Sequence, residues 1–139
     1  DVEVRVLSPI KGADYQDNLN DMSIVIKVTC GETSLLLTGD AESYAEELMI
    51  ASDKELLQAD VLKIGHHGSS TSSSQAFLDA VQPKAVVISL GKNNDYGHPH
   101  RETMQRLKKL ETEIYRTDEL GTVRMLFTES EVRLLKGSK

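Results

Sequence analysis

All four histidines of this chain lie in two short segments, and each segment follows an apolar run. His66 and His67 follow "VLKIG", and His98 and His100 close the segment "AVVISLGKNNDYGHPH". A third apolar run, "SLLL", is followed by "TGD", which ends in Asp40. Neutral imidazole and carboxylate are a ligand set for Zn²⁺, Mn²⁺ or Fe. Because ligands gather at the carboxyl ends of strands in α/β sheets, these residues at these positions predict a metal site.

Each of these residues also has an ordinary structural interpretation. Asp40 could cap the helix that follows it, because a short acceptor side chain is a common N-cap. The pair His66 and His67 could be a polar strand end, and "GHPH" could be a rigid turn with His100 near a helix N-cap. The sequence by itself leaves both interpretations open.

A tract rich in serine and threonine runs from Ser69 to Ser74, directly after the two adjacent histidines. A tract of this composition is most often a flexible loop. Its hydroxyl and backbone N–H groups would nevertheless suit an anion if they lay beside a metal. We therefore expect a flexible loop, with phosphate binding as the alternative.

The spacing of apolar residues predicts strands and helices in alternation, which is typical of a layered α/β domain with helices on at least one face of its sheet. Alternating or continuous apolar runs predict strands at residues 2–7, 23–30, 33–39, 59–65, 85–91, 113–117, 121–128 and 131–136. Helical spacing predicts helices at residues 42–52, between Ser74 and Pro83, and at residues 101–112. Glu42, Glu46 and Glu47 are predicted to form the solvated face of the first helix.

The composition is that of one compact domain. The 139 residues are 39% hydrophobic and 27% charged, which suits a single core and is too ordinary for a disordered chain. The net charge of −6 excludes a global basic surface that would bind duplex DNA by counterion release, so any contact with nucleic acid must be local. The single cysteine, Cys30, cannot form an intrachain disulfide, and we expect it to be buried.

The sequence contains no signal for a membrane or for export. No apolar run approaches the roughly 18 residues that a transmembrane helix needs, and "DVEVRVLSP" is not a signal peptide. We therefore expect this piece to be soluble. The chain begins without methionine and ends in "KGSK", from which we expect a fragment of a larger protein.

Five segments of the chain occur in an order that is specific to one family. They are "NDMSIVIKV", "LLLTGDAE", "ADVLKIGHHGSSTSSSQAFLDAVQPKAVVISLG", "YGHPH" and "YRTDELGTV". Together they closely resemble the C-terminal half of the metallo-β-lactamase-like domain of the ComEC/Rec2-type competence proteins, which internalise DNA in natural transformation. The resemblance implies an α/β fold that is the C-terminal half of an αββα sandwich, with residues 1–139 as one partial domain.

The resemblance also implies a metal site, with two divalent ions (Zn²⁺ or Mn²⁺) in the complete domain. Asp40 matches the aspartate that bridges the two metals, and one of His66 and His67 matches a late histidine ligand. The strand–Gly–His pattern favours His66, and His67 would then either support the ligands from behind or contact a substrate phosphate oxygen. Where other members carry a further histidine ligand, this chain has Asn20 and Asp21.

The remaining site residues are inferred from the same resemblance. His67 and His98 would be catalytic, and the substrate-binding residues would be Ser69, Ser70, Asn94, His98 and His100. The implied reaction is metal-assisted hydrolysis of a phosphodiester bond. In this reaction a metal-bound hydroxide attacks phosphorus, and the metals neutralise the developing charge.

One departure from the family limits this expectation. The family carries an HxHxDH motif in the first half of the domain, but no histidine precedes His66 in this chain. A tightly held metal usually needs about four ligands. We therefore expect the complete domain to be an active nuclease and this 139-residue chain to be inactive alone. The sheet face or edge left open by the missing half could let the chain form a homodimer.

The biological role that the resemblance implies is DNA uptake, in which the domain degrades the strand that is not imported. Its partners would be DNA at the uptake site and the membrane channel domain of the parent protein. The parent would lie in the bacterial cytoplasmic membrane, with this domain on the extracytoplasmic side. Two alternatives are a secreted phosphodiesterase or phosphocholine esterase of the same fold, and a non-catalytic DNA-binding module.

Overall fold

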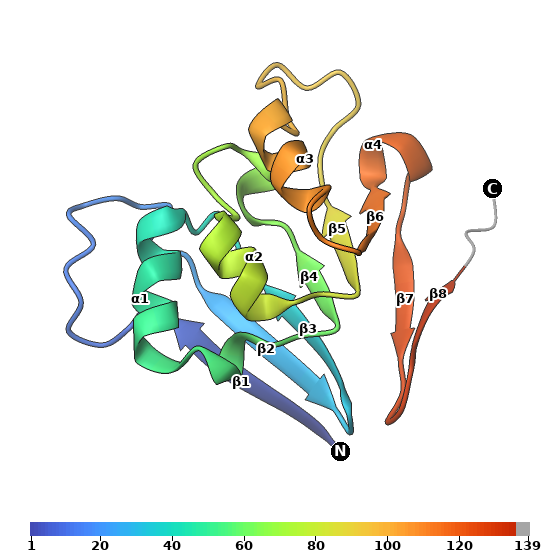
Figure 1. The fold of residues 1–139 in the computed structure, drawn as a ribbon, viewed down its shortest axis with the longest axis horizontal. Coiled ribbons are helices and arrows are strands. Elements are labelled where there is room, and N and C mark those ends of the chain that lie inside the picture. The colour runs from blue at the N-terminus through green and yellow to red at the C-terminus, as the bar shows by residue number, and fades with distance from the viewer. Residues whose placement is uncertain (136–139) are drawn as a thin grey trace.

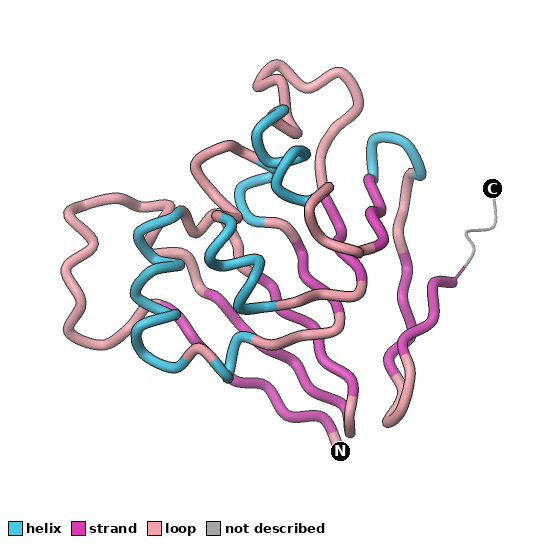
Figure 2. The backbone as a smooth tube through the Cα atoms, in the orientation of Figure 1, coloured by secondary structure: helices cyan, strands magenta, loops and turns pink. Residues whose placement is uncertain are grey.

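The computed structural model describes residues 1–135 and contains a six-stranded sheet, a two-stranded sheet and helices (Figures 1 and 2). The larger sheet consists of β1 (Val2–Ser8), β2 (Val25–Cys30), β3 (Thr33–Leu37), β4 (Val61–Lys63), β5 (Ala85–Ile88) and β6 (Glu113–Arg116). The α-helices are α1 (Ser43–Asp53), α2 (Gln75–Val81), α3 (Arg101–Leu107) and α4 (Thr117–Leu120). A separate hairpin consists of β7 (Arg124–Phe127) and β8 (Val132–Leu135). The predicted α/β class is thereby confirmed.

The strands of the larger sheet follow one another in chain order from β1 to β6. The first three strands pair antiparallel, and β3 to β6 pair parallel. Parallel strands end at the same edge of a sheet, so the loops that follow β3, β4 and β5 meet there. These loops carry Asp40, the adjacent histidines and the segment 91–100.

The hydrophobic core lies between the sheet and the helices that cover one of its faces (Figure 1). Leu36, Leu62 and Val86 lie side by side on β3, β4 and β5, and all three are fully buried. Phe77 and Leu78 of α2 belong to the same buried cluster. Burying each large apolar side chain contributes about 1.5–3 kcal/mol, so this layer anchors the strands whose ends form the site.

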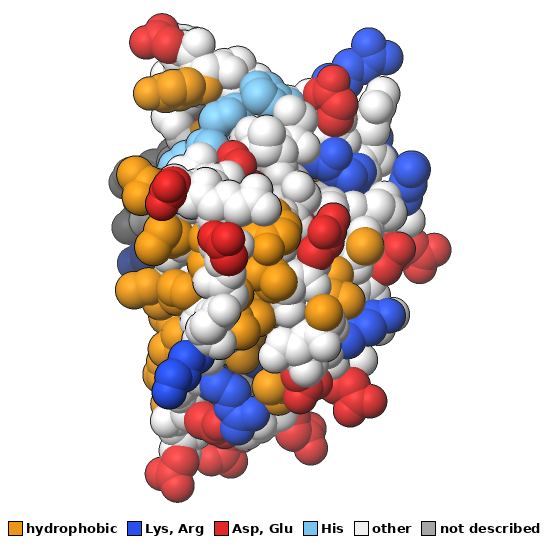
Figure 3. Space-filling view, turned by 90° about the vertical axis from the view of Figure 1, so that its left-hand side faces the viewer, with side chains coloured by type: hydrophobic (Ala, Val, Ile, Leu, Met, Phe, Trp, Pro, Cys, Tyr) orange, Lys and Arg blue, Asp and Glu red, His pale blue; other side chains and the backbone are white. Residues whose placement is uncertain are grey.

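The opposite face of the sheet is open at its β1 side, whereas Val61 and Ala85 on the same face are buried near the β7–β8 hairpin. On β1, Val2, Val4 and Val6 are 64%, 60% and 62% exposed. The strand register continues this face across Ile26 and Leu37, which are only partly buried. Figure 3 shows hydrophobic side chains gathered down one side of the molecule. An apolar residue at every second position is typical of a sheet face that packs against another layer.

Several predictions of secondary structure are wrong in detail. The turn α4 was not predicted, and β4 is shorter than predicted because the chain enters the 3₁₀ segment η2 (Gly65–Gly68) soon after Lys63. Cys30 is partly exposed rather than buried, because it lies beside Val2 on the open face. Residue 136 of the last predicted strand lies outside the described residues.

The helices of residues 1–135 include none that is long and apolar enough to cross a membrane. The longest of them, α1, has 11 residues and carries charged side chains along its length. The first helix was predicted at residues 42–52 and the structure places it one residue later, which confirms the helical spacing of its apolar residues.

Half of the serine-rich tract is buried, and the tract is hydrogen-bonded to other elements, so the prediction of a flexible loop is wrong. Ser69, Ser72 and Ser73 are 5%, 1% and 1% exposed. The side chain of Ser72 donates to the carbonyl of Ala41 at 2.5 Å, and Ser74 caps α2 by accepting from the backbone of the first turn. The tract is covered by other elements, and its buried polar groups therefore need partners inside the protein.

The prediction that the glutamates of α1 face solvent is also wrong for two of the three. Glu46 is 1% exposed and accepts the backbone N–H groups of Ser73 and Ser74 at 2.5 and 2.9 Å. Glu42 is partly buried, whereas Glu47 is exposed as predicted. The reason is that α1 lies against the serine-rich tract, which presents backbone donors rather than apolar surface.

We expect the purified chain to self-associate through the open face, because exposed valines gain free energy when they leave water. Val4→Glu places a charge between Val2 and Val6 on the exposed β1 side of this face and should shift the chain toward monomer in sedimentation velocity. Leu19→Glu is the matched control, because Leu19 is 80% exposed and lies in a loop away from the sheet. A wild-type chain that stays monomeric at high concentration would contradict this prediction.

Candidate metal centre

Three loops meet at the carboxyl edge of the parallel strands and enclose a cavity of about 360 Å³. Its wall consists of Asp40, His66, His67, Leu90, Gly91, Asn94, Tyr96 and His98. The fold therefore brings Asp40 together with three of the four histidines. Figure 3 shows the histidine side chains gathered next to one another near one end of the molecule.

Asp40 is positioned by the tight turn that ends β3. Gly39 has a φ of 57°, and a Cβ atom at this residue would lie only 3.0 Å from the Cβ of Ser23. The backbone N–H of Asp40 donates to the hydroxyl of Ser23 at 3.1 Å. The carboxylate of Asp40 is about 43% exposed and lies at the cavity wall.

The N-terminus of α1 is capped by Asp21 and not by Asp40. The buried carboxylate of Asp21 accepts the backbone N–H groups of Glu42 and Ala45 at 2.9 and 3.2 Å. Asn20 donates to the side chain of Glu42 at 3.2 Å. The helix-cap interpretation of Asp40 is therefore wrong, and Asn20 and Asp21 lie outside the cavity wall.

The adjacent histidines have unusual backbone conformations. His66 and His67 have φ values of 44° and 54°, in the left-handed region that residues other than glycine rarely adopt. The backbone N–H of His66 donates to Gly39 at 3.1 Å, and its carbonyl accepts from Ser69 at 2.8 Å. Such conformations cost about 1–3 kcal/mol each and cluster at functional sites. Here they turn two consecutive imidazoles into one cavity.

The hydrogen bond of His67 determines which ring nitrogen can bind a metal. Its Nδ1 lies 2.6 Å from the backbone carbonyl oxygen of Ser89. A carbonyl oxygen can only accept, so Nδ1 carries the proton and Nε2 presents a lone pair. This Nε2 lies 3.7 Å from Oδ1 of Asp40. A carboxylate oxygen and an imidazole nitrogen that face each other are donors of the kind that hold divalent metals.

His66 is oriented by Glu42, which the sequence analysis did not identify as a site residue. The Nδ1 of His66 lies 3.1 Å from Oε1 of Glu42, so this nitrogen donates and Nε2 is left to bind. Glu42 also accepts from Thr71 at 2.7 Å and from Asn18 and Asn20 at 3.2 Å. Desolvation acts to raise the pKa of Glu42, but these hydrogen bonds outweigh it, and the pKa is lowered. The carboxylate is therefore ionised near neutral pH.

His98 lies between two other aromatic rings. Its ring stacks on His67 with centroids 6.4 Å apart and on Tyr96 with centroids 5.6 Å apart. Desolvation, followed by the charges of His100 and the adjacent histidines, lowers the pKa of His98. His98 is therefore a neutral imidazole at physiological pH, with one donor and one acceptor nitrogen.

Three of the predicted substrate-binding residues, Ser69, Ser70 and His100, lie outside the cavity wall. Nδ1 of His100 accepts the backbone N–H of Ser70 at 2.9 Å, and Nε2 lies 3.2 Å from the carbonyl of Tyr96, to which it donates. Both ring nitrogens are thereby used. His100 connects the serine-rich tract to the "YGHPH" segment, a role that supports the site without facing its cavity.

Asn94 lines the cavity, and its side chain also holds the loop in which it lies. Its amide group donates to the carbonyls of Gly91 and His98 at 3.2 and 2.8 Å. Its side-chain oxygen accepts the backbone N–H of His98 at 2.9 Å. These bonds fix the position of His98 relative to β5.

The donor types at this cavity fit a divalent metal, but they do not complete its coordination. Asp40, His66 and His67 would supply a carboxylate and two imidazole nitrogens, whereas a structural or catalytic zinc typically has about four ligands. Within residues 1–135, no three histidine, cysteine, aspartate or glutamate side chains are close enough to hold a metal by themselves. Any metal held here therefore needs further ligands.

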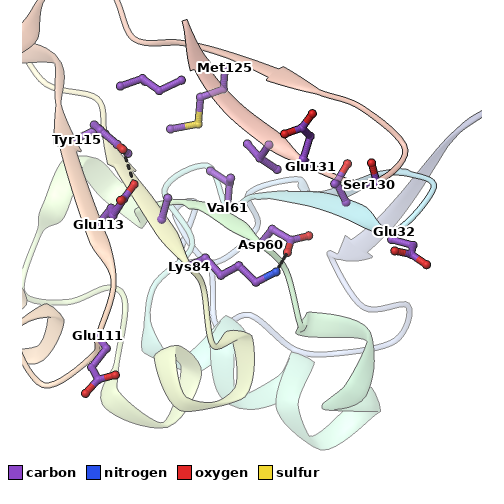
Figure 4. Close-up of a pocket in the computed structure, with 14 residues that line it drawn as sticks. Glu32, Asp60, Val61, Lys84, Glu111, Glu113, Tyr115, Met125, Ser130 and Glu131 are labelled. Atoms are coloured by element: carbon purple, nitrogen blue, oxygen red, sulfur yellow. Dashed lines mark hydrogen bonds and ion pairs between the residues drawn. The ribbon is translucent and has the colours of Figure 1, made fainter.

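A larger cavity of about 530 Å³ lies at the opposite ends of the parallel strands, beside the β7–β8 hairpin (Figure 4). Its charged lining residues are Glu32, Asp60, Lys84, Glu111, Glu113 and Glu131. Lys84 pairs with Asp60 at 2.8 Å, so its charge is already neutralised. No histidine lines this cavity, and its acidic wall would repel a phosphate. The smaller cavity is therefore the candidate site.

Comparisons with known proteins found one matching family model and several similar proteins. The family model described as the metallo-beta-lactamase superfamily matches residues 20–92, a segment that contains Asp40, His66 and His67. The chain is 40% identical over 123 residues to ComE operon protein 3 of Bacillus subtilis, with 88% of this chain covered. It is 37% identical over 130 residues to recombination protein 2 of Haemophilus influenzae, with 94% of this chain covered. It is 37% identical over 122 residues to competence protein ComA of Neisseria gonorrhoeae, with 88% of this chain covered. The chain spans only 16% to 17% of the length of these three relatives.

Proposed function

Because this chain belongs to the metallo-β-lactamase superfamily, we propose that it forms the C-terminal part of a metal-dependent hydrolase domain that cleaves DNA phosphodiester bonds. The observation that carries this proposal is the carboxylate of Asp40 facing Nε2 of His67 at 3.7 Å in the cavity, while Nδ1 of the same ring bonds to Ser89. Two of the similar proteins are named for competence and for recombination, which supports DNA as the substrate.

In this proposal, some residues of the cavity bind the metal and others contact the substrate. Asp40, His66 and His67 would hold the metal once further ligands and a shift of these side chains bring them around it, and Glu42 and Ser89 would orient the two imidazoles. Divalent metal ions held there would supply an activated water and neutralise charge on the phosphate. His98, neutral and at the cavity wall, would donate a hydrogen bond to a phosphate oxygen.

We further propose that the rest of the domain packs against the open valine face and brings the HxHxDH motif to the cavity. This packing would cover the face that Val2, Val4 and Val6 expose and would complete the αββα sandwich. Metal affinity rises steeply as the ligand set is completed, so the 139-residue chain should bind metal weakly and turn over no substrate alone.

In the cell, the proposed role is degradation of the DNA strand that is not imported during uptake. The partner of the domain would then be the membrane channel domain of the same protein, with this domain on the extracytoplasmic side of the bacterial cytoplasmic membrane. The similarity to competence protein ComA over 88% of this chain supports this role.

The proposal is tested by a nuclease assay of the complete domain with Mn²⁺ or Zn²⁺ on single-stranded and duplex DNA, beside this 139-residue chain. We expect metal-dependent cleavage by the complete domain that a chelator abolishes, and no turnover by the chain alone. Sustained turnover by the chain alone would show that the cavity residues suffice. If the complete domain binds DNA but does not cleave it with any metal, the hydrolase proposal is wrong and the domain is a DNA-binding module.

A further inference from the structure

Tyr96 is a large aromatic residue that the fold leaves in solvent beside the candidate site. Its residue surface is 78% exposed, yet the side chain lines the cavity. The ring stacks on His98 with an interplanar angle of 18°, and His98 stacks on His67 with an angle of 21°. A row of nearly parallel rings therefore leads from solvent to the imidazole that faces Asp40.

The backbone that carries Tyr96 is held firmly in place. Its carbonyl accepts from Nε2 of His100 at 3.2 Å. The following turn is held by Asn94, which bonds the backbone of His98 on both its N–H and its carbonyl. The loop that carries the Tyr96 ring is thus held by hydrogen bonds, which lowers the entropy cost of ordering it when a ligand binds.

The stability of the fold does not explain this arrangement. Tyr96 is not part of the buried cluster that forms the core, and within residues 1–135 its hydroxyl makes no hydrogen bond. A rigid, exposed aromatic ring at the rim of a cavity is suited to stacking against a flat ligand. Nucleobases are such ligands, and aromatic stacking of single-stranded nucleic acid is tolerant of sequence.

We propose that the outer face of Tyr96 is a stacking platform for one unpaired nucleobase of the DNA strand whose phosphate lies at Asp40, His66 and His67. This inference rests on the proposed function and adds a substrate preference to it. In a duplex, neighbouring bases cover both faces of each base, so the platform selects a single strand or a frayed end. The chain carries a net charge of −6, and stacking supplies affinity that a basic surface would otherwise have to provide.

The test measures binding of this chain to short oligothymidylate in a buffer that contains a chelator. Under this condition the result depends neither on bound metal nor on hydrolysis. Tyr96→Ala should weaken binding about tenfold, because stacking of one base on an aromatic ring is lost. Tyr96→Phe keeps the ring and should stay within about twofold of the wild type. An abasic oligonucleotide of equal length should bind the wild type and Tyr96→Ala equally. Leu19→Ala, which removes another exposed apolar side chain, is the matched control.

Two results would overturn the platform. One is oligothymidylate binding that Tyr96→Ala leaves unchanged, and the other is an equal loss of binding for the abasic strand. Either result would leave the proposed function standing if the complete domain still cleaves DNA. Conversely, the complete domain could fail to cleave DNA while oligothymidylate binding still depends on Tyr96. That result would support the stacking role of Tyr96 and contradict the proposed hydrolase function. Tyr96 is exposed, so its variants should fold, and their thermal unfolding should match that of the wild type.

Discussion

Asp40→Ala is expected to lower DNA hydrolysis by the complete domain by roughly a thousandfold or more. Residues of a catalytic site act together, so removing one of them loses most of the rate acceleration that they provide jointly. Asp40 is the carboxylate that faces Nε2 of His67, and among residues 1–135 it is the one acidic residue that lines the cavity. The loss should fall mainly on kcat, because the metal acts on the reacting phosphate more than on the remainder of the strand.

The matched control for Asp40 is Asp95→Ala, which removes an exposed carboxylate close to the same cavity that does not line it. This control should keep full activity. A second measurement does not depend on turnover: Zn²⁺ added to this chain should shift the imidazole signals of His66 and His67 in NMR spectra, and Asp40→Ala should weaken those shifts. Full hydrolytic activity of Asp40→Ala would contradict the assignment of this cavity as the metal centre.

Glu46→Ala is expected to destabilise the fold by about 3 kcal/mol, because two buried N–H groups would lose their acceptor. These groups belong to Ser73 and Ser74, in the tract that packs between Glu46 and the loops of the site. Glu47→Ala is the control: Glu47 is the exposed neighbour on α1, and its replacement should change the free energy of unfolding by less than about 0.5 kcal/mol. Urea denaturation of both variants and of the wild type measures their free energies of unfolding. An equal effect of the two variants would show that the buried contacts contribute nothing.

The pH dependence of stability provides a second test of Glu46. Desolvation raises the pKa of Glu46 above its ordinary value of 4.5, although the N–H groups of Ser73 and Ser74 and the charge of Arg106 oppose the shift. A raised folded-state pKa means that the folded chain keeps a proton that the unfolded chain releases. The stabilising contribution of this proton is greatest below pH 4.5 and is lost as the pH rises through the folded-state pKa. The stability of the wild type relative to Glu46→Gln, which cannot titrate, should therefore fall as the pH rises from 4.5 toward neutral.

The elements that place the site could be predicted from the sequence, because their signals are local. Strands β3, β4 and β5 are apolar runs that stop at "TGD", "GHHG" and "SLG", and parallel strands bring these ends to one edge. That reasoning identified Asp40, His66, His67 and His98, which line the cavity, and His100, which does not. Asn94, which also lines it, was inferred only from the family resemblance.

The sequence did not decide which polar residues support the fold and which face the cavity. The periodicity of α1 places its glutamates opposite the apolar stripe, but it carries no signal that a polar tract would cover that side and bury Glu46. The cap of α1 comes from Asp21, far along the chain from the helix that it caps, so no short motif could show it.

The tertiary structure also decided how each histidine is used. A hydrogen bond to Ser89 leaves Nε2 of His67 open toward Asp40. A hydrogen bond from Nδ1 to Glu42 leaves Nε2 of His66 without a partner on that side chain. His100 uses one ring nitrogen for the backbone of Ser70 in the serine-rich tract and the other for the carbonyl of Tyr96 in its own loop. Residue type and spacing therefore determined that imidazoles and a carboxylate would meet at the end of the sheet. Contacts between residues distant in sequence decided which nitrogen of each ring is available, because a tautomer depends on the partner that the fold brings to the ring.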